Sequence, residues 1–325
     1  MKEFIINSDN EGQRLDKYLN RIVGNGGMSF IFKMLRKKNF VLNDKKATGK
    51  EILKSGDNIK LYISDDTYNK FKSDINVESL SIKSDDTKLK GFNLEKNIIY
   101  EDKDIILINK PANMLSQKAK DGDISLNEYV LDYLLTKNEI TKDSILNYKP
   151  SCINRLDRNT TGIIIAAKTL HAATALSKGL KERSIKKYYK CIVKGIFNKN
   201  GLYSGYLIKD KNSNTVKISA NKQSDNDSYI ETEYKYLSSN DNVSEVLVHL
   251  ITGKSHQIRA HLAYLGFPII GDNKYGDFNL NKMLHAKTQM LHAYKIEFPD
   301  YRDEFEFSNK TFICEPDFRY WYGYI

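Results

Sequence analysis

One short segment of the sequence places an acid between two arginines immediately before a buried strand. Residues 154–162 read Asn-Arg-Leu-Asp-Arg-Asn-Thr-Thr-Gly, with Asp157 between Arg155 and Arg158, and the apolar run 163–167 follows directly. Nearby positive charge keeps a carboxyl group ionised, and an ionised carboxylate suits nucleophilic or electrostatic catalysis better than proton donation. A turn that feeds a buried strand also holds its side chains on a rigid element. The alternative is an ordinary turn in which Asp157 hydrogen-bonds its own backbone.

A second segment, residues 252–262, contains two histidines, His256 and His261. Their spacing of five residues places them roughly 140° apart on a helix, whereas a helical zinc pair needs a spacing of four. No acid lies between them, so we predict no metal site. A hydrolase that uses either histidine is an alternative, but the sequence offers no nucleophile to accompany it.

Apolar runs and their boundaries predict the elements that position these residues. Ser255 is expected to cap a helix that ends at Gly266. A capping box over 125–128 opens another helix. Four strands are expected, over 104–111, 163–167, 187–195 and 245–251. A further helix is expected over 169–180, and a polar hairpin over 200–242. The mixture indicates an α+β protein.

Composition limits the class of protein. A chain of 325 residues suggests about two domains. A net charge of +10 favours a polyanionic partner. Three widely spaced cysteines form neither a Cys-x-x-Cys pair nor a disulfide framework, which suits a reducing cytoplasm. No apolar run approaches the ~20 residues of a membrane span, so we expect a soluble cytoplasmic protein with no membrane partner.

Residues 1–64 hold more than half of the excess positive charge, with thirteen bases and seven acids, a net charge of +6. Two amphipathic helices are expected here, followed by strands. Their basic outer faces could follow a phosphate backbone; the alternative is an ordinary solvated surface. The candidate RNA-binding cations of the first helix are Arg14, Lys17 and Arg21, and those of the second are Lys33, Arg36 and Lys37. Residues 65–92, rich in Ser, Asp, Lys and Asn, are expected to form a linker.

Four segments, in order, resemble the motifs of the RluA-type pseudouridine synthases. Residues 154–162 resemble the family's catalytic signature, although Asn154 replaces the usual His and Thr161 the usual Ser. A strand ending Asn109-Lys110-Pro111 resembles the first motif. Residues 187–195 follow the pattern Lys-x-Tyr-x-Ala-x-Val-x-Gly, with Cys in place of Ala. Residues 253–259 resemble Gly-Arg-Thr-His-Gln-Ile-Arg, with Lys254 in place of the first Arg.

The resemblance implies a role for each matching residue. Asp157 is then the catalytic acid, and Arg259 the arginine that pairs with it. Tyr189 is the active-site tyrosine, which could stack on a displaced base; the alternative is a core aromatic. Arg155 occupies a position from which an arginine can enter the RNA. Lys254 keeps the charge of the arginine it replaces but loses the planar fork of donors.

The resemblance extends to the domain arrangement. The segment beginning Arg14-Leu15-Asp16 resembles the S-four-type RNA-binding module, although the usual Ser-Arg start of the second helix is missing. We therefore expect a small α/β RNA-binding domain over 1–64, a linker over 65–92 and a catalytic domain over 93–325. The implied catalytic fold is a mixed, mostly antiparallel sheet with flanking helices and a central cleft.

The implied reaction is the isomerisation of uridine to pseudouridine in RNA, for which no cofactor is expected. The target base must be flipped out of its stack. The domain order favours large-subunit ribosomal RNA as the substrate, with transfer RNA as the alternative, and we expect a monomer. A further hypothesis is an inert RNA-binding or ribosome-assembly protein, which the basic N-terminal unit would suit equally well.

Overall fold

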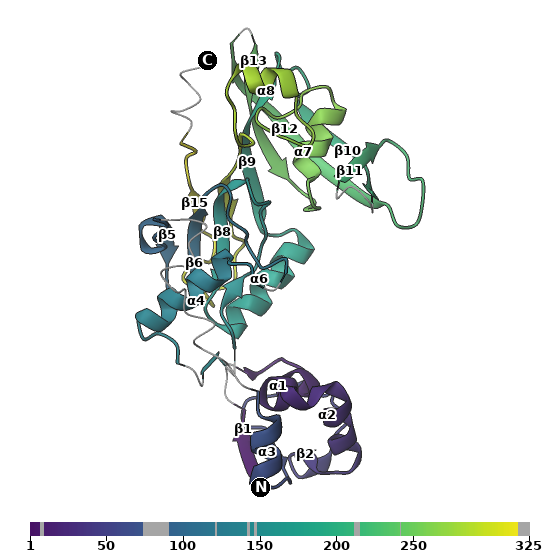
Figure 1. The fold of residues 1–325 in the computed structure, drawn as a ribbon, viewed down its shortest axis with the longest axis vertical. Helices are drawn as coiled ribbons and strands as arrows, with labels where there is room; N and C mark the ends of the chain where they lie inside the picture. The colour runs from purple at the N-terminus through teal and green to yellow at the C-terminus, as the bar shows by residue number, and fades with distance from the viewer. Residues whose placement is uncertain are drawn as a thin grey trace. The chain divides into compact units, whose positions relative to one another are not determined.

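The computed structural model describes residues 1–6, 10–73, 91–120, 122–141, 144–145, 148–210, 215–240 and 242–317. These residues form two compact units. The first comprises the described residues of Met1–Lys88, Asn127–Ser151 and Ala167–Thr174, and the second those of Leu89–Leu126, Cys152–Ala166 and Ala175–Ile325. No helix in the described part of the chain is long and apolar enough to cross a membrane. Figure 1 traces the elements in chain order.

The N-terminal segment folds around a four-stranded antiparallel sheet in the order β1-β4-β2-β3. Its strands and helices are β1 (Lys2–Ile5), α1 (Leu15–Val23), the 3-10 helix η2 (Gly24–Gly26), α2 (Gly27–Arg36), β2 (Phe40–Leu42), β3 (Lys45–Lys46), β4 (Asn58–Leu61) and α3 (Asp65–Phe71). The helices form because each presents an apolar face to one shared core. That core includes Leu15, Leu19, Ile31 and Leu35, all buried.

The structure differs from the sequence prediction at the start of the predicted linker. Residues 65–71 form α3 rather than a linker. The Ser64 hydroxyl accepts a hydrogen bond from the backbone N–H of Thr67 and so caps the helix, while Tyr68 and Phe71 pack against the N-terminal core. Residues 74–90 of the predicted linker lie outside the described residues. The domain boundaries at 64 and 92 stay predictions.

The second sheet has 11 strands, nine of them in the order β11-β10-β12-β13-β9-β14-β8-β6-β5, with β15 beside β14 and β7 beside β8. β9, β10, β12 and β13 pair antiparallel with their neighbours, whereas β14 and β8 run parallel. The predicted mixed, mostly antiparallel sheet is therefore confirmed. Its strands are β5 (Ile98–Glu101), β6 (Ile105–Lys110), β7 (Ser151–Cys152), β8 (Thr161–Ala167), β9 (Lys186–Lys194), β10 (Gly201–Asp210), β11 (Thr215–Ser219), β12 (Ser228–Ser239), β13 (Val243–Leu250), β14 (Leu291–Glu297) and β15 (Thr311–Ile313).

Strand β9 runs through the middle of this sheet (Figure 1). Helices after residue 91 include η4 (Glu95–Asn97), α4 (Leu126–Thr136), α6 (Leu170–Glu182), α7 (Gln257–Tyr264) and α8 (Phe278–Met283). α7 covers one face of the hairpin strands, because its Ala260 packs in a cluster with Leu207, Val216 and Ile230. The predicted cap at Ser255 is wrong: His256, in a left-handed conformation and without a capping side-chain bond, precedes α7.

Strands β8 and β14 approach each other closely at Gly162. Gly162 lies opposite Ala293 in the parallel pair and has φ +102°. A Cβ atom at this position would lie 2.3 Å from the carbonyl oxygen of Ala293. Only glycine accepts both the backbone angle and the close approach. The last residue of the 154–162 segment therefore fixes the loop that carries Asp157 to the sheet.

Candidate active site

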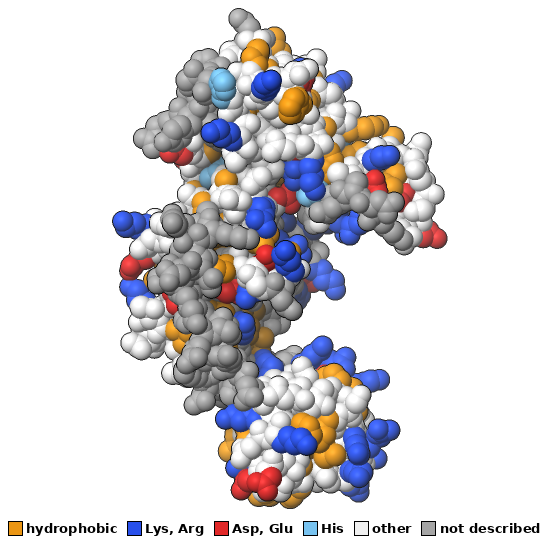
Figure 2. All heavy atoms as spheres, viewed as in Figure 1, with side chains coloured by type: hydrophobic (Ala, Val, Ile, Leu, Met, Phe, Trp, Pro, Cys, Tyr) orange, Lys and Arg blue, Asp and Glu red, His pale blue; other side chains and the backbone are white. Residues whose placement is uncertain are grey.

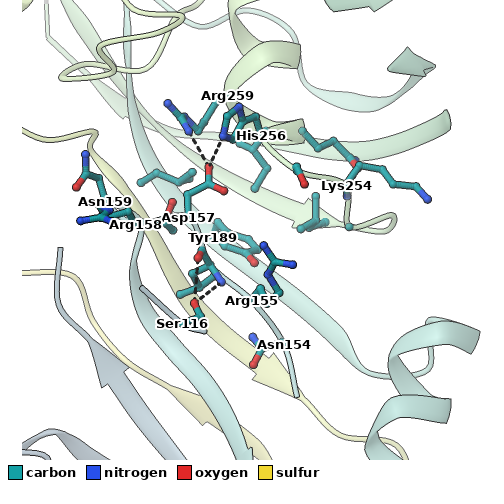
Figure 3. Close-up of a pocket in the computed structure, with 18 of the residues that line it drawn as sticks. Ser116, Asn154, Arg155, Asp157, Arg158, Asn159, Tyr189, Lys254, His256 and Arg259 are labelled. Atoms are coloured by element: carbon teal, nitrogen blue, oxygen red, sulfur yellow. Dashed lines mark hydrogen bonds and ion pairs between the residues drawn. The ribbon is translucent and has the colours of Figure 1, made fainter. Parts of the chain in front are cut away.

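A cavity of about 930 Å³ lies in the second unit, and several separate segments of the chain line it. They include residues 115–117, the loop 153–160 before β8, Lys187 and Tyr189 on β9, and residues 253–259 at the start of α7. The cavity thus collects three of the four motif segments found in the sequence. Figure 3 shows its central side chains, with the carboxylate of Asp157 pointing toward Arg259 and His256.

Arg259 connects two carboxylates. Its Nη1 donates to Asp157 Oδ2 at 2.8 Å, while Nε and Nη2 donate to Asp272 Oδ2 and Oδ1 at 2.6 and 2.9 Å. Asp272 is fully buried, whereas the Asp157 side chain retains 27% of its exposure and faces the cavity. The guanidinium is therefore held in the fixed two-pronged geometry by Asp272 and presents an Nη1 N–H group to Asp157.

Charge pairing overcomes burial in this network. Burial lowers the pKa of Arg259, but the hydrogen bonds and negative charges of Asp272 and Asp157 raise it further than burial lowers it. Burial likewise raises the pKa of Asp272, yet Arg259 and the backbone N–H groups of Lys274 and Tyr275 bring it below its usual value. Both groups therefore stay charged. The arrangement places a permanent cation against one oxygen of Asp157.

Tyr189 lies on β9 in the wall of the same cavity and is 6% exposed. Burial, and secondarily the negative charge of Asp157, raises the pKa of its phenol. The side chain therefore stays protonated at neutral pH and can donate a hydrogen bond. The Tyr189 side chain is buried, as expected of a core aromatic, and it also forms part of the cavity surface. Its role in the active site stays a prediction.

His256 and Tyr275 complete the surroundings of Asp157. His256 Nε2 lies 3.9 Å from Asp157 Oδ2 (Figure 3), and its Nδ1 is 2.9 Å from the hydroxyl of Tyr275. Burial lowers the pKa of His256, more than the charge of Asp157 raises it. The same Tyr275 hydroxyl accepts a hydrogen bond from the N–H of Val216. In the described part of the chain, no cluster of three or more His, Cys, Asp or Glu side chains could hold a metal ion.

The loop that carries Asp157 is fixed on both sides of that residue. The Ser116 hydroxyl accepts from the N–H of Leu156 and donates to its carbonyl oxygen, both at 3.0 Å (Figure 3). The ammonium of the fully buried Lys110 donates to the carbonyl oxygens of Arg158, Pro111 and Met114. Burial lowers the pKa of Lys110 to about 7. The strand ending Asn109-Lys110-Pro111 thus anchors the Asp157 loop.

The two departures from the family signature have structural roles here. The Oδ1 atom of Asn154 accepts from the N–H of Ile165 at 2.8 Å, which ties the loop to β8. Thr161, where the family usually has Ser, places its hydroxyl 2.7 Å from Nδ1 of the buried His292. Neither hydrogen bond involves Asp157. The substitutions therefore leave the carboxylate and its partners unchanged.

The predicted cations fall into two groups. Arg155 and Lys254 are exposed and line the cavity, with Lys254 set apart from the Asp157 carboxylate in Figure 3. The six cations predicted on the N-terminal helices belong to the first unit, and Figure 2 shows Lys and Arg side chains over the surface of that segment. Five of the six are exposed. Arg21 is not: it is half-buried, and its Nη2 donates to Asn10 and Gln13.

Several residues of the site carry no role in the sequence analysis. Asp272 belongs to a Gly-Asp pair that is typical of a turn, and Tyr275 follows three residues later. His256 was weighed only as a metal ligand or hydrolase residue. Lys187 lines the cavity two residues before Tyr189. Strand periodicity could have identified Lys187 from the sequence, because residues two apart on a strand share a face and Tyr189 was already predicted to face the active site.

The comparisons with known proteins agree with this geometry. Residues 104–264 match the sequence model of the RNA pseudouridylate synthase family. The chain is 31% identical over 323 residues to an uncharacterized RNA pseudouridine synthase of Mycoplasma capricolum, with 98% of each chain covered. It is 34% identical over 289 residues to the ribosomal large subunit pseudouridine synthase C of Rickettsia felis, with 87% of each chain covered.

A solved structure, human RNA pseudouridylate synthase domain containing 4, shares the fold with a TM-score of 0.55 at 23% identity, covering 69% of this chain and 90% of that chain. The family match and the sequence relatives define an isomerase acting on RNA. The chain belongs to the RluA-type RNA pseudouridine synthases and converts uridine to pseudouridine in RNA. The predicted enzyme class is confirmed, and the hydrolase hypothesis is wrong. The S-four-type assignment of residues 1–64 stays a prediction.

Proposed function

We propose that Asp157 is the catalytic carboxylate and that the cavity around it receives the flipped target uridine. The observation that carries this proposal is the 2.8 Å hydrogen bond between Asp157 Oδ2 and Arg259 Nη1 on the wall of a cavity of about 930 Å³. A carboxylate held against a permanent cation is oriented before the substrate arrives. Its side chain is exposed to the cavity, whereas that of Asp272 is sealed away.

The reaction breaks the bond between N1 of uracil and C1′ of ribose, turns the base, and joins C5 to C1′. Asp157 acts at the ribose, either by direct attack on C1′ or by assisting removal of the C2′ proton to give a glycal. In both routes the electron pair of the breaking bond stays on uracil, and the proton on C5 leaves after the new bond forms. Arg259 positions Asp157, and Tyr189 packs against the uracil and donates a hydrogen bond.

Access to the target requires that its base leave the stack, at a cost of a few kcal/mol that is smallest in loops. Arg155 lies at the exposed edge of the cavity next to Asp157, where its guanidinium can occupy the vacated position. Lys254 and the N-terminal cations Arg14, Lys17, Lys33, Arg36 and Lys37 bind phosphates. Arg21 instead supports the fold of its helix, because it is half-buried and its Nη2 donates to Asn10 and Gln13.

The substrate proposed here is large-subunit ribosomal RNA. The support is the similarity to the Rickettsia felis relative, a ribosomal large subunit pseudouridine synthase, over 87% of this chain. Transfer RNA is the alternative. We further propose that residues 1–64 form the RNA-binding domain, that the enzyme acts in the cytoplasm, where such RNA is processed, and that it acts as a monomer.

Asp157→Asn tests the catalytic assignment. This variant keeps the volume of the side chain and loses its charge, so it should fold and bind RNA but release no tritium from RNA labelled at C5 of uridine. Asp225→Asn, which changes an exposed carboxylate paired with Lys222, is the matched control and should behave as wild type. Undiminished tritium release by Asp157→Asn would contradict the assignment.

Mapping of pseudouridines tests the substrate. Ribosomal and transfer RNA from cells with and without the gene are compared position by position. Loss of specific pseudouridines from large-subunit ribosomal RNA, restored by the wild-type gene and not by Asp157→Asn, is the expected result. Loss confined to transfer RNA would instead support the alternative substrate.

A further inference from the structure

Strand β9 carries four lysines, and three of them are paired with carboxylates. Lys186 lies 3.9 Å from Glu297, Lys190 lies 2.8 Å from Glu315, and Lys194 lies 2.6 Å from Asp277. The fourth, Lys187, has no hydrogen-bond or ion-pair partner among the described residues. It is also the only one of the four that lines the cavity around Asp157.

The Lys187 ammonium lies at an inner wall of that cavity. The side chain is half-buried, and its Nζ packs against Gly253, where an added Cβ would lie 3.3 Å from it. Residues two apart on a strand point to the same face, so Lys187 and Tyr189 face the cavity together. Burial alone lowers the pKa of Lys187, with no neighbouring carboxylate to offset it.

A cation partly removed from water without an anion destabilises the fold. Such a feature persists where a functional partner supplies the missing charge. The other inner cation, Arg259, is already bound by Asp157 and Asp272. The remaining cations of the lining are exposed to water, namely Arg155, Arg158, Lys181, Lys254 and Lys274. Lys187 is therefore the one inner cation of the described cavity whose charge is left for a ligand.

We propose that Lys187 binds a backbone phosphate of the nucleotide that enters the cavity. Lys187 lies one strand repeat from Tyr189, about 7 Å along β9. A backbone phosphate of a nucleotide whose uracil lies against Tyr189 is thus within reach of this lysine on the same face. The ion pair holds the flipped nucleotide after its base has left the stack. Lys187 is thus a substrate-binding residue, separate from the chemistry at Asp157. The inference rests on the proposal that this cavity is the active site.

The test compares Lys187→Met with Lys187→Arg and with Lys186→Met as the matched control on the same strand. The probe is total RNA labelled with tritium at C5 of uridine and isolated from cells that lack the gene, so the result does not depend on which RNA is modified. Turnover is measured at several KCl concentrations to give kcat, KM and the slope of log KM against log salt. A thermal melt verifies folding, and Lys187→Gln replaces Lys187→Met if the latter does not fold.

Removal of a charge-assisted hydrogen bond should raise KM about ten- to a hundredfold and make the salt slope shallower by about one. The kcat of Lys187→Met should stay within about twofold of wild type, and Lys187→Arg should restore KM. Lys186→Met should change neither value. An unchanged KM and slope, or a loss of kcat without a change in KM, would overturn the inference.

The two proposals fail separately. If Asp157→Asn retains turnover, the cavity is not the active site, and the inference about Lys187 falls with it. If Asp157→Asn is inactive while Lys187→Met keeps the KM of wild type, only the assignment of Lys187 to a phosphate is refuted, and Lys187 is an aliphatic stem that packs against the cavity wall.

Discussion

The unequal sharing of Arg259 between two carboxylates is the main feature of the site at the scale of single residues. Asp272 takes Nε and Nη2, and Asp157 receives only Nη1. If Asp157 becomes uncharged during the reaction, Arg259 still has a full negative partner. The buried cation therefore stays neutralised throughout the reaction, and its position does not depend on the state of Asp157.

Asp272→Asn should weaken both folding and catalysis. The change leaves the buried guanidinium with one exposed partner, and breaking a buried pair in this way costs about 3–5 kcal/mol. The apparent free energy of unfolding in urea should fall by that order. Because Asp272 positions Arg259 and does not reach the substrate, kcat should fall at least tenfold while KM changes little.

Asp277→Asn is the control for Asp272→Asn. Asp277 lies five residues further along, is not buried, and pairs with Lys194 at the start of α8. Asparagine caps a helix as well as aspartate does, so the variant should lose little stability and leave kcat unchanged. Equal effects of the two variants would show that Asp272 has no special role in positioning Arg259.

Lys110 should make stability depend on pH. Its pKa is about 7 in the folded protein and about 10.4 in the unfolded chain. Between these values the unfolded chain binds the additional proton, so the free energy of unfolding rises with pH. Relative to Lys110→Met, which cannot titrate, wild type should gain up to about 1.4 kcal/mol per pH unit from pH 7 to 10. Urea unfolding at pH 7 and pH 9 measures the difference, and a constant difference would contradict the prediction.

The sequence predicted the pairing of Asp157 with Arg259 but not the buried carboxylate of Asp272 that holds Arg259 in place. Asp157 and Arg259 were identified from their motifs, 102 residues apart, and the structure places them 2.8 Å apart. Asp272 could not be assigned, because an aspartate after glycine is typical of a turn and its partner is set by tertiary packing. The burial of Arg21 was missed for the same reason: helix periodicity placed it on the outer face, but Asn10 and Gln13 cover it.

At the scale of elements, the close approach of β8 to β14 fixes the site. Gly162→Ala would place a methyl group 2.3 Å from the carbonyl oxygen of Ala293 and force alanine to φ +102°. Overpacking costs about 1–3 kcal/mol, and the backbone strain adds about 1–3 kcal/mol. We expect the apparent Tm to fall by at least about 5 °C, together with a reduced kcat, since the Asp157 loop moves with β8.

Gly201→Ala separates the two causes of that destabilisation. Gly201 has φ +116°, and a Cβ there would meet nothing within 4 Å. Gly201 lies at the start of β10. The variant therefore measures the effect of backbone strain on stability without a steric collision. Its apparent Tm should fall by clearly less than that of Gly162→Ala, and kcat should not change. Equal shifts in Tm would mean that the close approach to Ala293 is unimportant.

Local patterns predicted most strands but not their order. The apolar runs at 104–111, 163–167, 187–195 and 245–251 correspond to β6, β8, β9 and β13. The order of the sheet depends on pairings over long sequence separations, which no local pattern encodes. Helix α3 was missed because its Ser- and Asp-rich start has the composition of a linker, although Ser64 and the two following acids are also a helix start.

At the scale of the whole molecule, charge is distributed unevenly. Of the net charge of +10, residues 1–64 carry +6. On α2, Lys33 and Arg36 are exposed, as is Lys37 just after it, while Ile31, Met34 and Leu35 are buried on the other side. These three cations are available to phosphates without any change in the core. They therefore offer a test of the N-terminal segment that leaves the cavity around Asp157 untouched.

The triple variant Lys33→Ala, Arg36→Ala and Lys37→Ala should weaken RNA binding without changing the chemistry. Each cation withdrawn from a phosphate makes the slope of log affinity against log salt shallower by about 0.7–0.9, so a change of about two to three is expected. The decrease in affinity should be similar for modified and unmodified RNA, because binding to phosphates carries no sequence information. At saturating RNA, kcat should equal that of wild type.

The control replaces three exposed lysines of the second unit, Lys199, Lys235 and Lys282, with alanine, which changes the net charge equally. If the affinity of both triple variants falls equally, general charge attracts the RNA, and the N-terminal helices have no specific part in binding it.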